Sequence, residues 1–508
     1  MRIVNRTGRT IHIPDLDLHI TDKNGESEDI PLDSLKRSRG LRSLLINEVT
    51  GIEIKDYDPE EHTEKSIMFF RRKKQEQMDE VKQTRPIPRS SFEWSGTSVD
   101  TNLSIQEPHE EHAEDTTPVE PPKIEIADKE LKMVLRGVFY SEGGYSKVNR
   151  HLAEGMHKLG VKVKVDPLKA KNYLKEEDLA GVMRLTKTDL DRFACHVNSV
   201  IPARNPYPSA VHKVLYTTIE SYSIPDQFLD VFKTYNEIWA TSEWSASIIR
   251  QFFDERPVHV VRPGVDTDLY TPEGPKFNLG VDARSFVFLA IFGWSYRKGY
   301  DVLLRAYLDE FSDSDDVTLL ICSRYMGQAQ NPFKDKIQDD INKICGEFSG
   351  KKLPHIARLS QILPEADMPK LYRAANCFVL PTRGEGICLP PLEASCCGLP
   401  LIITNVSGQR DYVSEGNCFS IDMDELVKVR PGQMHTHYWD GQLFPSLRSS
   451  LVHGKLRSSM RTVLEDYNEA KRRNRLLMRQ IHQSFTWQHT CQQAYGRLRQ
   501  IFDGDGRR

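Results

Sequence analysis

Short apolar runs alternate with amphipathic stretches after residue 130, and this alternation predicts the elements of the chain. The apolar run LKMVLRGVFY is followed by a glycine-containing turn, the helix-like KVNRHLAEGMHKLG and the strand-like VKVKV. Further strand-like runs are FACHVNSV, VLYTTIE, EIWATS and VHVVRPG. Because buried strands that alternate with helices are typical of a parallel sheet, residues 129–263 are expected to form a doubly wound α/β domain.

The same alternation restarts after residue 263. Strands are predicted at SFVFLAIFGW, VTLLICS, HIARLSQ, CFVLPT and LPLIITN, and stretches such as KGYDVLLRAYLDEF predict the helices between them. We therefore expect a second α/β domain over residues 264–475, followed by a helical segment over residues 476–508. Open α/β sheets bind ligands beyond the carboxyl ends of their strands, so two such sheets suggest a cleft between them.

The first 128 residues have a different texture. Residues 1–60 contain short alternating runs (RIVNRT, TIHIP, LDLHI, GIEIKDY) with turn signals and one helix-like stretch, and are expected to form a small β-rich accessory module. Residues 61–128 begin with a highly charged, helix-like stretch. They continue as a segment rich in Pro, Ser, Thr and Glu, a composition that predicts a disordered linker.

Composition narrows the class of protein. The 69 Lys and Arg against 72 Asp and Glu give a net charge of −3, which does not indicate a chain held to nucleic acid or a membrane by its overall charge. Local basic clusters at 36–42, 71–74 and 471–475 could contact an anionic surface, although such runs are usually solvated. The nine cysteines form no CxxC pair, and no run suits a signal peptide or a membrane span, so a cytoplasmic location is expected.

The stretch TRGEGICLPPLEASCCGLP carries the strongest chemical signal. A strand is expected to end before it, and its two adjacent prolines suit the first turn of a short helix, whose free N–H groups could hold a diphosphate. Glu393 could simply complement the helix dipole, whereas Glu385, on a loop between glycines, has no helix to serve. Because carboxylates bind vicinal hydroxyls, a ligand with phosphate and sugar groups would suit both acids.

This motif resembles the glutamate-pair signature of glycosyltransferase family 4, whose members are retaining enzymes with the GT-B fold. The resemblance covers about residues 131–502 and leaves the N-terminal 130 residues unassigned. It implies two Rossmann-like domains that face a cleft, and a nucleoside diphosphate sugar as donor substrate. No cofactor or metal is required by this reading, and the phosphate oxygen of the donor would accept the proton of the acceptor.

The resemblance also assigns roles within the motif. Glu385 would contact the donor sugar, and Glu393 would bind the ribose hydroxyls. The donor-binding segment between the two glutamates includes Gly386, Ile387 and Leu389.

A second motif, FGWSYRKGYDVLLRAYLDEF, resembles the phosphate-binding turn of the same family. Its basic residues are Arg297 and Lys298, which would stabilise the charge that develops on the leaving diphosphate. Many members have an arginine where this chain has Trp294, so Arg297 could replace it. Without the resemblance, two basic residues at a helix start would be read as solvated surface.

Four further candidate residues come from the first domain. Gly143 and Gly144 match the glycine loop of the family, where the backbone approaches the donor. His196 is a catalytic candidate and Glu220 a donor-binding candidate, because both are predicted at strand ends that face the cleft. Each also has a plain structural reading, as a turn glycine or a satisfied polar residue.

Other residues carry less chemistry. The histidines of the linker and of the stretch MHTHYW lack a matching ligand set, and Asp266 and Asp268 lie in a segment that resembles the interdomain connection of the family, so no metal site is predicted. Trp487 matches the aromatic position of a closing helix, which crosses back to the first domain in this fold.

Several functions stay open at this point. The leading prediction is a retaining glycosyltransferase whose acceptor could be a glycan, a lipid-linked sugar, a protein or a nucleic-acid base. The same fold also serves nucleotide-sugar epimerases and phosphorylases, although the expected pyridoxal lysine setting is not found. A third alternative is an assembly or docking protein with an inactive transferase domain, which would bind a protein partner through residues 1–130.

Overall fold

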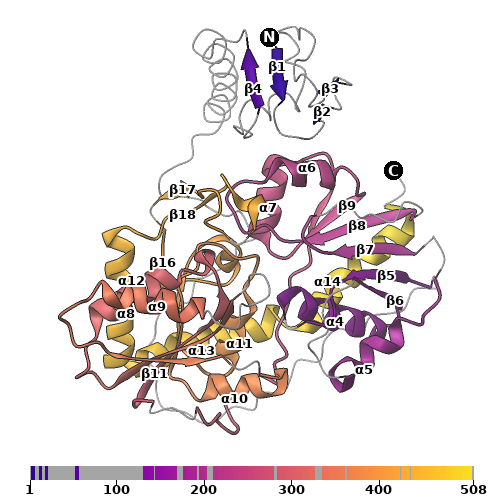
Figure 1. Cartoon of the computed structure of the whole chain (residues 1–508). Coiled ribbons are helices and arrows are strands. Elements are labelled where there is room, and N and C mark those ends of the chain that lie inside the picture. Colours follow the sequence, from indigo (N-terminus) through magenta and orange to yellow (C-terminus); the bar gives the residue numbers. More distant parts are fainter. Residues whose placement is uncertain are drawn as a thin grey trace, which may run out of the picture. The chain divides into compact units, whose positions relative to one another are not determined.

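Two six-stranded parallel sheets dominate the structure after residue 130 (Figure 1). The computed structural model describes residues 2–5, 11–13, 18–20, 52–55, 130–141, 143–168, 176–190, 194–202, 210–279, 283–325, 335–360, 363–423, 425–434 and 436–505. The chain divides into two units, residues 1–121 and 122–508. None of the described helices is both long and apolar enough to cross a membrane.

The first unit contains four described strands, which pair in two antiparallel ladders. Strand β1 (Arg2–Asn5) pairs with β4 (Ile52–Lys55), and β2 (Ile11–Ile13) pairs with β3 (Leu18–Ile20). All four lie within the runs that predict a β-rich module. The predicted helix of that module, and the charged helix and linker of residues 61–128, lie outside the described residues.

The first sheet of the second unit has the order β10-β9-β8-β7-β5-β6, and its strands are parallel. Its strands are β5 (Lys132–Gly137), β6 (Lys162–Pro167), β7 (Cys195–Ser199), β8 (His212–Thr217), β9 (Glu237–Ala240) and β10 (Val258–Val260). Its helices are α4 (Gly144–Lys158), α5 (Glu176–Leu185), α6 (Asp226–Phe232) and α7 (Glu243–Phe252). The strand order reverses at β5, which places the turn into α4 at a usual position for ligand binding.

The second sheet has the order β13-β12-β11-β14-β15-β16 and is also parallel. Its strands are β11 (Phe286–Trp294), β12 (Val317–Tyr325), β13 (His355–Leu359), β14 (Cys377–Leu380), β15 (Leu401–Thr404) and β16 (Phe419–Ile421). Helices and short 3₁₀ turns between them are η3 (Tyr296–Lys298), α8 (Tyr300–Glu310), α9 (Lys336–Gly346), η4 (Glu365–Asp367), α10 (Met368–Arg373), α11 (Leu389–Cys396) and η5 (Ser407–Asp411). The order reverses between β11 and β14, and the loops after these two strands carry the motifs. The predicted doubly wound α/β fold is therefore confirmed.

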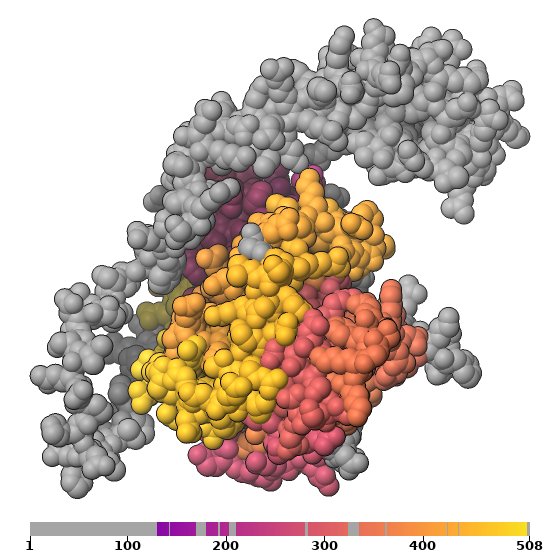
Figure 2. All heavy atoms as spheres, turned by 90° about the vertical axis from the view of Figure 1, so that its left-hand side faces the viewer, coloured from indigo at the N-terminus to yellow at the C-terminus, as the bar shows by residue number. Residues whose placement is uncertain are grey.

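Three helices close the chain. Helix α12 (Ser450–Glu465) packs against α8, and Figure 2 shows these yellow C-terminal residues beside the red residues near 300. Helix α13 (Tyr467–Ser484) begins where Asp466 caps it, and packs against α11. Because α13 runs through residue 475 without a break, the structure places no boundary there.

Helix α14 (Trp487–Gln500) returns to the first sheet, where it packs against α4 (Figure 1). The ring of Trp487 stacks on His151 of α4, with 4.3 Å between the centroids. Near the other end of α14, Arg497 Nη2 lies 2.7 Å from Glu237 Oε2 of β9. The last helix thus holds the first domain, although the segment before it belongs to the second.

An insertion between β16 and α12 also reaches the first domain. It contains β17 (Leu426–Lys428), η6 (His437–Trp439) and the antiparallel partner β18 (Leu443–Pro445). The carbonyl of Leu443 accepts a hydrogen bond from the N–H of Tyr222 at 2.9 Å. The buried Trp439 packs its ring against Phe228 of α6, with 6.1 Å between the centroids. We call residues 426–445 the insertion hairpin.

A cap on α7 forms a further link between the domains. The carboxylate of Asp411, at the end of η5, accepts hydrogen bonds from the N–H groups of Glu243 at 2.8 Å and Trp244 at 3.2 Å. Arg262 Nε also lies 3.1 Å from Asp411 Oδ2. Ser242 caps the N–H of Ser245 from the same segment, whereas the N–H groups of Glu243 and Trp244 find their partner in the second domain.

Candidate functional site

The loop after β14 carries Glu385 into a cluster of charged side chains at the carboxyl edge of the second sheet. Glu385 Oε1 lies 2.5 Å from Lys298 Nζ and accepts a hydrogen bond from Thr382 Oγ1 at 2.9 Å. Glu385 Oε2 lies 3.2 Å from Arg297 Nη1. The residue is only 4% exposed, so both of its carboxylate oxygens meet cations in a nearly dry environment.

The backbone of this loop is fixed by η5. The N–H of Glu385 donates to Ser407 Oγ at 2.7 Å, and its carbonyl accepts from the N–H of Gly408 at 2.9 Å. Ser407 adopts a positive φ of 47°, and Cys388, after the loop, a φ of 66°. Left-handed backbone is unfavourable for residues other than glycine, so the chain is strained at Cys388, inside the motif, and at Ser407, which holds the N–H of Glu385.

Arg297 joins the two domains at this cluster. Its Nη1 lies 3.2 Å from Glu220 Oε1, which follows β8 of the first sheet, and also donates to the carbonyl of Gly384. The turn after Arg297 depends on Gly299, whose φ is 73° and whose Cβ, if present, would lie 1.8 Å from the carbonyl oxygen of Pro381. Only glycine allows the two loops of the second domain to approach this closely.

The two carboxylates that share Arg297 titrate differently. Burial alone would raise the pKa of Glu385, but the charges of Lys298 and Arg297 outweigh it and hold that pKa below its ordinary value. The pKa of Glu220 is raised, because burial and the charge of Glu385 together exceed the attraction of Arg297 and Lys298. Of the two, Glu220 therefore takes up a proton first as the pH falls, and Glu385 keeps its charge to lower pH.

Glu393 lies in a second cluster, which also joins the domains. Its Oε1 lies 2.6 Å from Lys147 Nζ of α4, and its Oε2 accepts a hydrogen bond from Tyr372 OH at 2.8 Å. Lys147 Nζ is also 2.6 Å from Glu365 Oε1 and 2.9 Å from Tyr270 OH. Each glutamate of the motif is thus paired with one lysine. The lysine of Glu385 belongs to the same domain, and the lysine of Glu393 belongs to the other domain.

The start of α11 differs from the sequence expectation in two respects. Glu393 is the fifth residue of α11, beyond the first turn, so complementing the helix dipole does not explain it. Pro390 and Pro391 occupy the first turn as predicted, but they remove two of the N–H groups that would hold an anion. Cations near the helix, rather than its N–H groups alone, are therefore the main source of positive charge.

The other predicted donor-binding residues lie around these clusters. Gly143 precedes α4 and Gly144 begins it, one turn before Lys147. A Cβ on Gly386 would lie 1.9 Å from Thr218 Oγ1 of the first domain, so this glycine allows the domains to touch. Ile387 and Leu389 are buried between the two glutamates. No ligand contact of these residues is tested, and their donor-binding roles stay predictions.

His196 is not brought to this site. It is the second residue of β7 (Cys195–Ser199), near the amino end of the strand, whereas Glu220 follows the carboxyl end of β8. Three residues of strand, about 10 Å, separate it from the carboxyl edge. The placement expected for His196 at a strand end facing the cleft is therefore wrong, since an apolar run predicts a strand without fixing its end. A catalytic role loses its geometric support.

Trp294, at the position where relatives often carry arginine, turns away from the charged cluster. Its ring stacks on Tyr300, with 4.3 Å between the centroids, and its Nε1 donates to Asp340 of α9 at 2.9 Å. Arg297, three residues later, is the arginine that reaches Glu385. Asp266, in the segment with two nearby aspartates, accepts hydrogen bonds from the N–H groups of Asp268 and Leu269, as a turn residue does.

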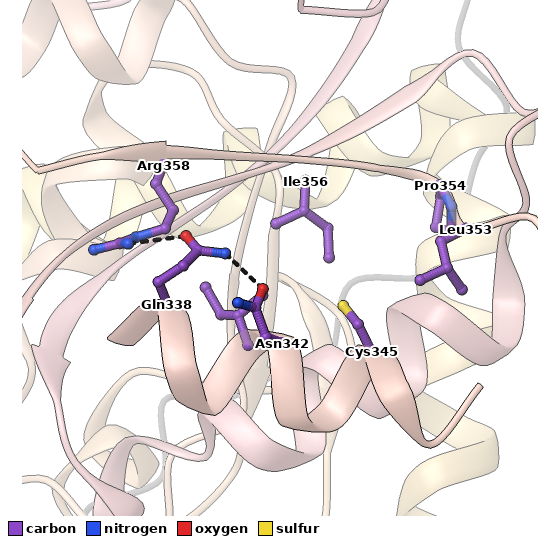
Figure 3. Close-up of a pocket in the computed structure, with 8 residues that line it drawn as sticks. Gln338, Asn342, Cys345, Leu353, Pro354, Ile356 and Arg358 are labelled. Carbon is purple, nitrogen blue, oxygen red and sulfur yellow. Dashed lines mark hydrogen bonds between the residues drawn. The ribbon is translucent and has the colours of Figure 1, made fainter. Parts of the chain in front are cut away.

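Two cavities lie elsewhere on the second domain. One of about 200 Å³ lies between α9 and the edge strand β13, where Gln338 bridges Arg358 and Asn342 (Figure 3). Another of about 340 Å³ lies beside the start of α8, against Asp301 and Arg448. Neither is lined by Glu385 or Glu393, so the candidate site is defined by its charged clusters rather than by these cavities.

The sequence interpretation missed several residues of the site. Lys147 follows the glycine turn but lies 246 residues from Glu393, and nothing in the sequence pairs them. Arg383, inside the motif itself, forms a bidentate pair with Asp301 at 2.8 and 2.9 Å. The basic residue between the strand and Glu385 could have indicated that Arg383 has an acidic partner. The partners of Lys147 could be identified only from the folded structure.

Comparison with known proteins shows what this second domain is similar to. Residues 283–430 match the family model for glycosyl transferases group 1. The D-inositol 3-phosphate glycosyltransferase 1 of Catenulispora acidiphila is 27% identical over 162 residues, which cover 31% of this chain and 38% of that protein. The UDP-Gal:alpha-D-GlcNAc-diphosphoundecaprenol alpha-1,3-galactosyltransferase of Escherichia coli is 28% identical over 183 residues, 34% of this chain and 44% of that protein. The matches thus span less than half of either relative.

The fold has a wider counterpart among solved structures. The sucrose-phosphate synthase of Thermosynechococcus elongatus aligns with 74% of this chain and 100% of its own, with a TM-score of 0.52 at 16% identity. At this identity the likeness concerns the fold alone. The family match covers residues 283–430, the stretch that contains both motifs.

Proposed function

We propose that this chain, whose residues 283–430 form a group 1 glycosyltransferase domain, transfers a sugar from a nucleoside diphosphate sugar to an acceptor. The observation that carries the proposal is the pairing of Glu385 with Lys298 and Arg297 at the carboxyl edge of the sheet. This edge is where open α/β folds bind their ligands. The Escherichia coli relative acts, by its name, on UDP-Gal. We propose the same class of donor, a nucleoside diphosphate sugar, for this chain, but not the same sugar.

Lys298 and Arg297 are the groups that would stabilise the leaving diphosphate. Cations already fixed in a dry site stabilise developing charge without reorganising. Arg297 is 8% exposed, and its Nε is buried without a hydrogen-bond partner among the described residues. We infer that Arg297 replaces the family arginine that is absent at Trp294.

Glu385 would bind hydroxyls of the donor sugar, and Glu393 those of the ribose. A carboxylate whose two oxygens already meet cations, and whose pKa is lowered, is a weak base and a weak nucleophile. This favours a retaining reaction in which the leaving phosphate, not Glu385, takes the proton of the acceptor. The sugar would pass through a transition state with oxocarbenium character.

The test measures release of nucleoside diphosphate from a panel of donor sugars by the full chain. Glu385→Ala and Lys298→Ala should each lower turnover by about a hundredfold or more, because each removes charge at the reacting centre. Lys352→Ala, which changes a lysine whose side chain is 84% exposed, is the matched control and should keep full turnover. Circular dichroism would check that the variants fold.

Other outcomes would point elsewhere. Near-normal turnover in both variants would overturn the assignment of this site. Conversion of a donor into its epimer in the absence of acceptor would show an epimerase. A chain that binds donors but releases no diphosphate would favour the docking alternative, in which residues 1–130 engage a partner.

A further inference from the structure

Lys147 is one of the residues of α4 through which the first domain contacts the second, together with Arg150 and His151, which lie 3.9 and 3.8 Å from Glu365. Its Nζ lies 2.6 Å from Glu393 Oε1, 2.6 Å from Glu365 Oε1 and 2.9 Å from Tyr270 OH. The ammonium group donates hydrogen bonds to Glu393 Oε1 and Tyr270 OH, and Glu365 Oε1 lies within ion-pair distance of it. The side chain is 12% exposed, so the contacts are made largely away from water.

The charges of this cluster depend on one another. Burial alone would lower the pKa of Lys147, but Glu393, Tyr270 and Glu365 together outweigh it and raise that pKa above its ordinary value. Burial would likewise raise the pKa of Glu365, yet contacts with His151 and Lys147 lower it to about 2. Without Lys147, two carboxylates would face one another in a partly buried site.

Stability alone gives a weak reason for such an arrangement. Replacing a buried ion pair by apolar residues is often neutral for stability, because the cost of desolvating the charges offsets their attraction. The cluster instead fixes the position of one atom pair. Tyr372 holds Glu393 Oε2 and Lys147 holds Glu393 Oε1, so the carboxylate plane cannot rotate while the domains are together.

We propose that Lys147 is a positioning residue of the donor site, which orients Glu393 to receive the two ribose hydroxyls of a nucleoside diphosphate. This inference rests on the proposed function, because it assigns the ribose to Glu393. Since Lys147 comes from the opposite domain, Glu393 is correctly oriented only while the domains are closed.

The test compares the affinities of UDP, GDP and ADP with those of analogues that lack both ribose hydroxyls, measured by calorimetry on the full chain. In the wild-type protein the hydroxyls should strengthen binding of the preferred nucleotide. Lys147→Met should weaken that nucleotide by roughly tenfold to a hundredfold, the usual range for a charged hydrogen bond, and should leave its analogue unchanged. Lys147→Arg should recover part of the loss.

Controls separate positioning from folding. Lys158→Ala, at the exposed end of the same helix, should bind like the wild type. Adding Lys147→Met to Glu393→Gln should cost nothing further, because the lysine acts through that carboxylate. If Lys147→Met does not fold, Lys147→Arg carries the test, and it should still weaken the nucleotide more than its analogue.

Three results would overturn the inference. Equal loss of nucleotide and analogue in the Lys147 variants would show a general structural effect. Losses from Lys147→Met and Glu393→Gln that multiply would show that the two residues act separately. A wild-type protein that binds nucleotide and analogue equally would remove the ribose from Glu393. Failure of wild-type protein to bind any of the nucleotides would instead overturn the proposed function.

Discussion

Gly143 and Gly144, at the start of α4, are predicted donor-binding residues whose need for glycine can be judged from the structure. Both have unexceptional backbone angles, and a Cβ on Gly144 would meet nothing within 4 Å. Neither packing nor conformation therefore requires glycine at position 144. Gly386 differs, because a side chain there would collide with the first domain. The open space at Gly144 is the kind that a ligand approaching the backbone would use.

The variant Gly144→Ala tests this reading. Its free energy of unfolding should be unchanged or up to about 1 kcal/mol higher, since alanine is favoured over glycine in a helix. Donor turnover should fall at least tenfold if the donor approaches the backbone there. Gly454→Ala in α12, also without atoms within 4 Å of its Cβ, is the control for stability and should keep full turnover. Unchanged turnover in Gly144→Ala would remove this residue from the site.

Among the elements, the insertion hairpin shows why short strands are not predicted from the pattern of apolar residues. Its strands LVK and LFP have three residues each, too few to display an alternation. In the folded chain, Trp439 and Phe444 of the hairpin join the apolar cluster that contains Phe228 of α6. Phe444 also lies against Gly384 of the motif loop. The hairpin therefore supports the first domain and the loop of Glu385 together.

Removing the main apolar contact of the hairpin should be costly. Trp439→Ala is expected to lower the free energy of unfolding by about 3–5 kcal/mol, the range for large aromatic residues in a core. Leu426→Ala, on the same hairpin at 38% exposure, should cost less than about 1 kcal/mol. Urea unfolding followed by tryptophan fluorescence and by circular dichroism measures both. Equal stability of the two variants would show that the hairpin does not hold the domains.

For the whole molecule, the pairing of Glu237 with Arg497 contributes to the dependence of stability on pH. Burial would raise the pKa of Glu237, but the neighbouring His212, together with hydrogen bonds from Arg497 and Trp239, holds it at about 2. The folded pKa is below the unfolded value, so the pair contributes stability above pH 4.5 and loses it as the pH falls toward 2. A shift of this size corresponds to about 3 kcal/mol.

Glu237→Gln should therefore destabilise the protein at pH 7, and its stability should fall less steeply than that of the wild type between pH 4.5 and 2. Thermal unfolding across this range measures the difference. Glu469→Gln, which changes an exposed pair on α13 with Arg472 and Arg473, is the comparison and should have a small effect. Parallel pH profiles of wild type and Glu237→Gln would contradict the assignment.

Sequence patterns predicted most of the fold, and they identified the glutamates and the basic pair of the site but not all of their partners. Long apolar runs with helices between them predicted both sheets, because burial on two faces imposes that pattern. The glutamate and lysine motifs could be found because their residues are close in sequence. The partners of Lys147, the position of His196 within its strand and the break at Asp466 could not, because each depends on contacts or on a strand end that periodicity does not set.

The cap that Asp411 places on α7 makes domain separation a measurable event. The amide protons of Glu243 and Trp244 are bonded to a carboxylate of the other domain, so they can exchange with solvent only when that carboxylate departs. Their hydrogen-exchange rate therefore reports how often the domains separate, and it can be measured in the absence of any substrate. A ligand that keeps the domains together would slow the exchange of these two amide protons, whatever sugar it carries.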